Sequence, residues 1–197
     1  MTGHIFIITG PSGVGKGTLC ALLLKINPRF TLSISATSRT VRAGEVDGVN
    51  YYFKTREAFE AMIEHDRQAL DATQHHLLEW AEYNGQFYGT PREPVEAALQ
   101  SGRHVLLEIE TAGAMQVKQK FPAACQIFIA PPDMTTLEQR LRARDTEDEL
   151  NIQNRLRIAQ HELTQQDRFD YVVINHKLDS ALSEISQIVE NWHGSGV

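Results

Sequence analysis

The sequence predicts a three-layer α/β fold built on a mainly parallel central sheet. Four short apolar runs rich in β-branched residues have the pattern of strands that are buried on both faces of a sheet. Segments with helical spacing separate these runs, and strands that alternate with helices pair in parallel. The length of 197 residues provides one substantial core, so we expect a single domain.

The elements follow in order along the chain. The first strand, Ile5 to Thr9, ends at Gly10, and a glycine-rich loop comes next. A helix then follows because apolar side chains recur at positions 19, 22, 23 and 26, and Asn27 and Pro28 end it. The remaining buried strands are expected at residues 104–110, 125–132 and 171–175.

Composition excludes several classes of protein. The formal charge is −6, from 19 Lys and Arg against 25 Asp and Glu, so nothing attracts the whole chain to nucleic acid or to an anionic membrane. We expect no signal peptide, because the amino terminus has no basic region and no small-residue cleavage site, and no run reaches the length of about 18 apolar residues that a membrane span needs. We expect Cys20 and Cys125 to be reduced thiols, and we therefore expect a cytoplasmic protein.

The glycine-rich loop, "GPSGVGKGT", matches the phosphate-loop pattern G-x-x-x-x-G-K. Its glycines let backbone N–H groups turn toward phosphate oxygens, and Lys16 reaches the β- and γ-phosphates of a nucleotide. A plain glycine turn with a surface lysine is the alternative, but the strand before and the helix after disfavour it. Gly17 stands where the general pattern has Ser or Thr. The residues expected to bind ATP here are Gly10, Pro11, Ser12, Gly13, Val14, Gly15, Lys16, Gly17 and Thr18.

Four further stretches extend the pattern: "SISATSRTVRAGEVDGVNYYF", "LLEWAEYNGQFYGTPREPV", "VLLEIETAGAMQVKQKFP" and "FIAPPDMTTLEQRLRARDTEDELNIQNRL". With the loop they resemble the guanylate kinase family, in order and over nearly the whole chain. The resemblance implies a P-loop nucleoside-monophosphate kinase that uses ATP and Mg to phosphorylate GMP, and also dGMP, with ADP as the other product. It also implies a core of residues 1–34, 98–136 and 158–197, an inserted GMP-binding region of 35–97 and a short lid of 137–157.

The same resemblance assigns the acceptor site. Ser35 meets the guanine, and Glu79 reads the base with Thr90 beside it. Guanine presents two donors, N1 and N2, next to an acceptor, O6, so a carboxylate with nearby hydroxyls complements it. The residues expected to hold the GMP phosphate are Arg39, Arg42, Tyr51 and Tyr88.

Further carried-over residues complete the expected machinery. Glu110 contacts GMP, whereas Glu108 and Thr18 lie near the Mg-nucleotide and hold the metal through water. Asn175 matches a position near the adenine end of ATP. The residues expected to stabilise the transferring phosphoryl group are Lys16, Arg140, Arg144 and Arg155.

Several positions depart from the family pattern. The family commonly has Asp where Glu110 stands, and Thr111 and Ala112 replace its bulky residue and Gln. Asp145 follows Arg144 where a glycine is usual, and the segment 64–76 before "LLEWAE" is longer. Its paired histidines, at 75 and 76, lack partners at metal-ligand spacing and are more often solvated than metal-bound.

These departures leave two alternatives open at this stage. One is a guanylate-kinase-like binding module without catalysis, although such modules typically erode the phosphate loop that this chain keeps. The other is a kinase with an altered acceptor nucleotide. Oligomeric state also stays open, since a sheet edge or the longer segment could build a homodimer.

Overall fold

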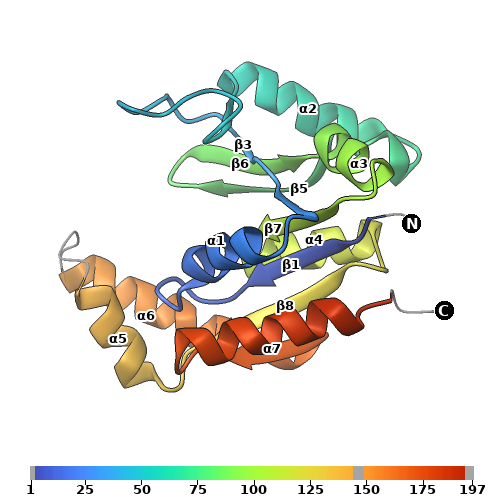
Figure 1. Ribbon diagram of the computed structural model, residues 1–197. Helices are drawn as coiled ribbons and strands as arrows, with labels where there is room; N and C mark the ends of the chain where they lie inside the picture. Colours follow the sequence, from blue (N-terminus) through green and yellow to red (C-terminus); the bar gives the residue numbers. More distant parts are fainter. Residues whose placement is uncertain (1–2, 144–148, 194–197) are drawn as a thin grey trace.

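The computed structural model describes residues 3–143 and 149–193, which form two sheets (Figure 1). The larger sheet is five-stranded with order β2-β7-β1-β8-β9, and all of its pairings are parallel. The prediction of an α/β fold on a mainly parallel central sheet is therefore confirmed. Its strands are β1 (Ile5–Thr9), β2 (Phe30–Leu32), β7 (His104–Glu108), β8 (Cys125–Ala130) and β9 (Tyr171–Ile174).

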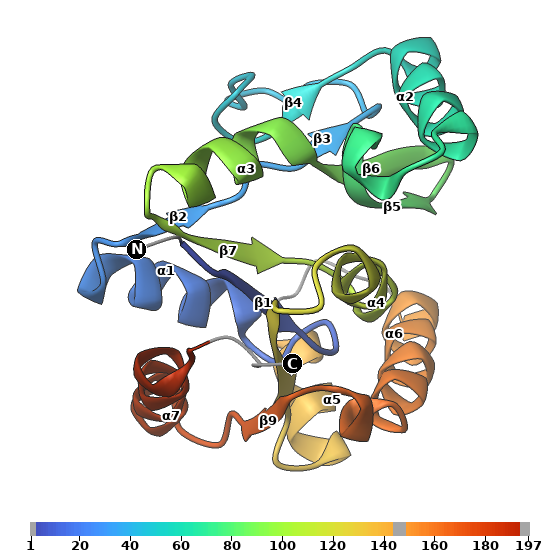
Figure 2. The same cartoon turned by 90° about the vertical axis from the view of Figure 1, so that its right-hand side faces the viewer.

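Helices cover both faces of this sheet and create the three layers (Figure 2). Side chains alternate across β1, so Phe6 and Ile8 pack into the core cluster beneath α1 (Lys16–Ile26), α5 (Met134–Arg142) and α7 (Leu178–Asn191). Ile5 and Ile7 pack on the opposite side, beneath α3 (Arg92–Gln100) and α4 (Thr111–Lys120). Helix α6 (Glu149–Leu163) packs against α5.

The smaller sheet has the order β4-β3-β6-β5 and belongs to the inserted region. Its strands are β3 (Ala36–Thr37), β4 (Tyr52–Phe53), β5 (Leu77–Tyr83) and β6 (Gln86–Pro91), and α2 (Arg56–Gln68) packs on them. Asn84 (φ 50°) and Gly85 (φ 70°) connect β5 to β6. Left-handed backbone at both central positions is the mark of the hairpin turn that an Asn-Gly pair favours.

The long segment before β5 is tied back onto the start of that strand. After α2 it forms a 3-10 turn at Ala72–Gln74. The buried carboxylate of Asp66 accepts the backbone N–H groups of His76 at 2.6 Å and of Leu77 at 3.0 Å. Arg92 donates to the carbonyl of Ala72 at 2.6 Å. The extra residues thus close into a loop that begins and ends beside β5.

The observed strand ends differ from the expected ones by a few residues. Strand β7 stops at Glu108, and Glu110 occupies the N-cap position of α4, so the expectation that Glu110 extends this strand is wrong. Thr111 already begins α4, so the chain passes from strand to helix within residues 109–110. None of the helices in the described ranges has the length and apolar character that a bilayer crossing requires.

Candidate active site

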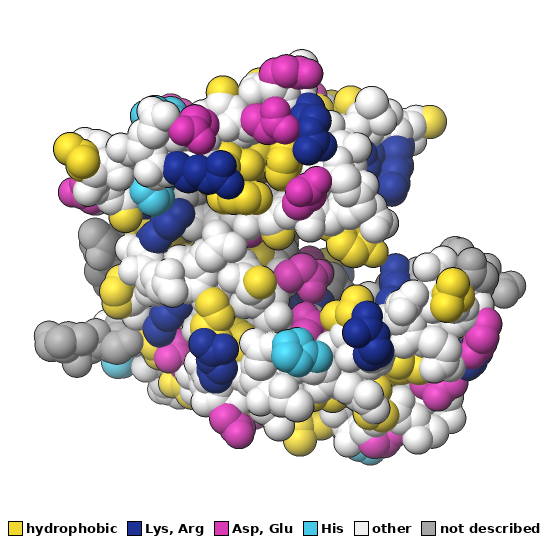
Figure 3. Space-filling view, turned by 180° about the vertical axis from the view of Figure 1, so that it is seen from behind, with side chains coloured by type: hydrophobic (Ala, Val, Ile, Leu, Met, Phe, Trp, Pro, Cys, Tyr) yellow, Lys and Arg dark blue, Asp and Glu magenta, His cyan; other side chains and the backbone are white. Residues whose placement is uncertain are grey.

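The phosphate loop lies at the carboxyl end of β1, where parallel sheets bind ligands. Residues 11–13 and 15–18 line a cavity of about 480 Å³ together with Glu108 and Glu110. Figure 3 shows the molecule hollowed between its two halves, with acidic side chains inside the cleft and basic ones on its rim. The loop and both predicted glutamates therefore face one space.

Backbone conformation explains the glycine at the start of the loop. Gly10 has φ +131°, a value that side chains rarely permit, and a Cβ there would lie 2.2 Å from the carbonyl oxygen of Ile129. Gly13 and Gly15 also have positive φ, at +92° and +97°. The loop can pass this close to β8 only with glycine at position 10.

Lys16 folds over the loop that precedes it. Its ammonium donates to the carbonyl of Gly10 and, at 3.2 Å, to that of Pro11. Both oxygens belong to the loop itself, and Lys16 begins α1. An ammonium at the mouth of the loop is placed to exchange these carbonyls for phosphate oxygens.

Three other predicted residues contact the loop or each other. Asn175 is buried and donates from Nδ2 to the carbonyl of Val14 at 2.7 Å, and its own carbonyl accepts Arg140 Nη2 at 2.9 Å. Arg155 Nη1 donates to Ser12 Oγ at 3.2 Å. The structure thus joins α5, α6 and the end of β9 to the phosphate loop. Arg144 and its neighbour Asp145 lie outside the described residues.

The predicted base-reading carboxylate lies on β5 at the edge of the smaller sheet. Glu79 is 6% exposed, and its Oε1 accepts the hydroxyl of Thr90, on the paired strand β6, at 2.7 Å. Burial raises the pKa of Glu79 to about 6, and the Thr90 hydrogen bond opposes this rise. A Cβ at Gly113 would lie 2.7 Å from Glu79 Oε2, so α4 meets this carboxylate directly.

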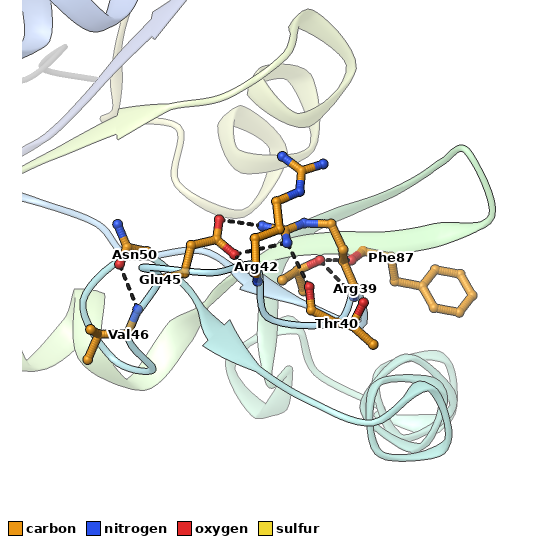
Figure 4. A network of polar contacts seen from close by, with 8 residues as sticks. Arg39, Thr40, Arg42, Glu45, Val46, Asn50 and Phe87 are labelled. Carbon is orange, nitrogen blue, oxygen red and sulfur yellow. Dashed lines mark hydrogen bonds and ion pairs between the residues drawn. The ribbon is translucent and has the colours of Figure 1, made fainter.

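The predicted phosphate-binding arginines lie between β3 and β4 (Figure 4). Arg39 forms a two-point ion pair with Glu45, with Nη2–Oε1 at 2.7 Å and Nη1–Oε2 at 3.0 Å. The guanidinium also lies 5.4 Å from the centre of the Tyr51 ring, which packs against Tyr88. Arg42 lies in the same β3–β4 connection as Arg39. The four residues expected at the GMP phosphate therefore gather in one region.

Comparison with known proteins decides the family. The guanylate kinase family model matches residues 2–192. The chain belongs to the guanylate kinase family.

Individual relatives agree with this assignment. A guanylate kinase from Synechocystis is 51% identical over 95% of this chain and 93% of its own length, and one from Desulfitobacterium hafniense is 48% identical over 95% and 89%. Among solved structures, the guanylate kinase from Anaplasma phagocytophilum has a TM-score of 0.72 and 29% identity, covering 100% of this chain and 92% of that one. Both sequence and fold thus place the whole chain within guanylate kinases.

Glu45 is a residue of this guanylate kinase site to which the sequence analysis gave no role. Besides pairing with Arg39, it accepts the backbone N–H of Arg42 at 2.8 Å, while the Arg42 side chain extends away from it (Figure 4). The Arg39 guanidinium and this N–H hold the pKa of Glu45 below its ordinary value. In the sequence, the acid lies six positions after the arginine, with a glycine turn between them. This spacing does not by itself identify the ion pair.

The remaining predicted residues have clear positions. Ser35 lies between β2 and β3, and its carbonyl accepts the N–H of Tyr52 at 2.9 Å. In the described part of the chain, no group of three His, Cys, Asp or Glu side chains is arranged to hold a metal ion. The His76 ring instead lies against the His65 ring at an interplanar angle of 46°, with ring centres 4.1 Å apart.

Proposed function

We propose that this chain transfers the terminal phosphoryl group of ATP to GMP, and also to dGMP, giving ADP and the nucleoside diphosphate. The observation that carries this proposal is the shared cleft. A complete phosphate loop lines it on one side together with Glu108 and Glu110. The other half of the molecule consists of the smaller sheet, which carries the Glu79–Thr90 pair, and the β3–β4 connection, which carries Arg39 (Figure 3). Membership of the guanylate kinase family supports the same activity.

In this proposal, the loop amides and Lys16 hold the phosphates of ATP. Lys16 leaves the carbonyls of Gly10 and Pro11 and donates to the β- and γ-phosphates, where opposite charge makes its hydrogen bonds stronger. Asn175 acts from behind, because it holds the Val14 carbonyl and so keeps the loop in its binding shape. The donor therefore meets a site that is organised before it arrives.

Magnesium fits the oxygen atoms that line the same cavity. The Thr18 hydroxyl and the Glu108 carboxylate would hold Mg²⁺ through water, because this ion keeps several waters when it binds oxygen ligands and phosphate oxygens. A Cβ at Gly17 would lie 3.4 Å from Glu108 Oε1, so this carboxylate lies over the first turn of α1. When bound, the ion neutralises phosphate charge during transfer.

Arg39, Arg42, Tyr51 and Tyr88 hold the GMP phosphate in this proposal. The Glu45 carboxylate accepts from Nη1 and Nη2 of the Arg39 guanidinium, which carries five N–H donors in one plane. The side that carries Nε can then receive a phosphate oxygen while Glu45 fixes the orientation. Glu45 thus prepares Arg39 for the acceptor.

Glu79, Thr90, Ser35 and Glu110 read the guanine. Ionised Glu79 accepts hydrogen bonds from N1 and N2, whereas adenine would direct its N1 lone pair at that carboxylate. A buried polar group left without a partner costs about 1–3 kcal/mol, so this contact favours guanine. We extend the proposal to the division of the chain into core, GMP-binding region 35–97 and lid 137–157, to charge stabilisation by Arg140, Arg144 and Arg155, and to a cytoplasmic location.

A coupled assay of ADP release tests the proposal. Purified enzyme with ATP and Mg²⁺ is offered GMP, dGMP, AMP, UMP or CMP in parallel, and Lys16→Ala provides the background. We expect turnover with GMP and dGMP far above that background. GMP turnover no greater than that of Lys16→Ala would overturn the kinase activity, and faster turnover with another nucleotide would overturn the acceptor assignment.

A further inference from the structure

Helix α4 covers the outer edge of β5. This strand is the terminal one of its sheet, and α4 lies along it. A terminal strand presents N–H and C=O groups that need partners. Gly113, Gln116 and Lys120 are three and four positions apart, so they share one face of the helix. That face supplies the contacts to β5.

The Gln116 carboxamide bonds both backbone groups of one residue. Its Oε1 accepts the N–H of Trp80 at 3.2 Å, and its Nε2 donates to the carbonyl of Trp80 at 3.0 Å. A backbone N–H can only donate and a carbonyl can only accept, so the pair also fixes the orientation of the amide. For Trp80, this side chain takes the place of a neighbouring strand.

Residues of α4 on either side of Gln116 contact the same short stretch of β5. Lys120 Nζ donates to the carbonyl of Leu77 at 2.8 Å. Gly113 lies so close to Glu79 that a Cβ there would be 2.7 Å from Oε2. Trp80 directly follows Glu79, so the two Gln116 bonds hold the backbone next to the carboxylate.

The same helix begins beside a second carboxylate of the proposed base site. Glu110 is the N-cap residue of α4, and Gln116 lies six positions further along the helix. We infer that Gln116 is a positioning residue: by fixing Trp80 to α4, it sets Glu79 relative to Glu110 and thereby strengthens the preference for guanine. This inference rests on the proposed function, in which both carboxylates contact the base.

The variant Gln116→Met tests this role because it keeps the length of the side chain and removes both hydrogen bonds. We expect the KM for GMP to rise about tenfold, equivalent to about 1.4 kcal/mol, while the KM for ATP stays within about twofold. We also expect a smaller preference for GMP over IMP, which lacks the 2-amino group. A displaced Glu79 no longer gains fully from that group.

Gln126→Met is the matched control. Gln126 is buried and likewise bonds a backbone carbonyl, since its Nε2 donates to the carbonyl of Ala114 in α4 at 2.7 Å, but it lies on β8 in the central sheet. This control should lower the melting temperature and leave the preference for GMP over IMP unchanged. An equal loss of preference in Gln126→Met would mean that any loosening of α4 suffices, and would overturn a specific role for Gln116.

Two further variants keep the outcome decisive. Gln116→Ser removes the same bonds without adding an apolar group, and circular dichroism establishes that each variant is folded. Folded Gln116 variants with the wild-type KM for GMP and the wild-type preference over IMP would overturn the inference. Glu79→Gln separates the two levels. If it weakens GMP and the Gln116 variants do not, only the positioning role fails, whereas an unchanged Glu79→Gln would overturn the proposed base contact as well.

Discussion

The proposed donor and acceptor ends of the cleft are built in different ways. At the donor end, one continuous stretch from Gly10 to Thr18 supplies the loop, and its backbone makes the binding surface. At the acceptor end, side chains from β5, β6, the β3–β4 connection and α4 must come together. The donor end therefore depends on local backbone shape, and the acceptor end depends on how separate elements pack.

Two glycines make this difference concrete. Gly10 is required by its own backbone, since its φ is +131° and a Cβ would strike the Ile129 carbonyl at 2.2 Å. Gly113 sits in the regular helix α4, and the three atoms nearest to a Cβ there would all belong to the Glu79 side chain. One substitution at each position contrasts the two kinds of site.

The largest effect is expected for Gly10→Ala. The added methyl group must displace either the loop or β8, and displacing catalytic groups by about 1 Å can cost about 100-fold. We expect kcat/KM to fall by at least about 100-fold for both substrates, together with a lower melting temperature.

Gly85→Ala is the control for Gly10→Ala. Gly85 also has a positive φ, +70°, but an added Cβ would meet no described atom within 4 Å. It should cost about 1–2 kcal/mol of stability without a comparable loss of activity. Equal losses of activity in the two variants would show that the strain of alanine at a positive φ, and not the contact between position 10 and β8, accounts for the effect of Gly10→Ala.

A selective effect is expected for Gly113→Ala. The new Cβ pushes Glu79 Oε2 away, so the KM for GMP should rise about tenfold while the KM for ATP is unchanged. Alanine favours a helix over glycine by about 1 kcal/mol, so loss of α4 cannot account for the change. Steady-state kinetics with each substrate varied in turn provides the measurement.

Ala112→Gly is the matched change on the exposed side of α4. It weakens the helix and adds nothing near Glu79, so it should leave the KM for GMP unchanged. If Gly113→Ala also left that KM unchanged, the carboxylate would not depend on close packing against α4.

The smallest effect is expected from pH. Burial raises the pKa of Glu79 to about 6, so acidification through this value protonates the group that accepts from guanine in the proposed function. From pH 7.5 to pH 5.5, the KM for GMP should rise about fourfold through Glu79 alone. Because the folded state binds this proton more tightly than the unfolded state, the stability that this group contributes is fully present below about pH 4.5 and is lost as the pH rises through about 6.

Glu79→Gln isolates this contribution, because the phosphate of GMP titrates in both proteins. The ratio of the wild-type KM to the variant KM should rise as pH falls from 7.5 to 5.5. A ratio that stays flat over this range would place the ionisation of Glu79 outside the binding step.

The sequence was most informative where a structure depends on neighbours in the chain. The phosphate loop, the β1 strand before it and the end of α1 at Ile26 were all predictable from local pattern. Strand β2 was missed because it has only three residues. The helix N-cap at Glu110 was also missed, since an apolar run does not reveal where a strand turns into a helix.

Contacts between distant segments account for the rest. The resemblance placed Asn175 near adenine, whereas its bond to Val14 spans 161 positions and becomes visible only in the folded chain. The ion pair of Arg39 with Glu45 and the two bonds of Gln116 to Trp80 are of the same kind. Residue type and spacing allow such pairs without selecting them, because many other acids and amides are equally available.

The loop closed by Asp66 has a practical consequence. Because that carboxylate binds the N–H groups of His76 and Leu77, the intervening residues leave and re-enter the fold at nearly one point. The entropic cost of closing such a loop grows only slowly with its length, so residues added at its tip reduce the stability of the fold only slightly. Leu70, whose side chain is fully exposed, marks a place where a fluorophore or an affinity tag can be attached to the acceptor sheet. A reporter there would lie on the loop that Asp66 ties to the start of β5.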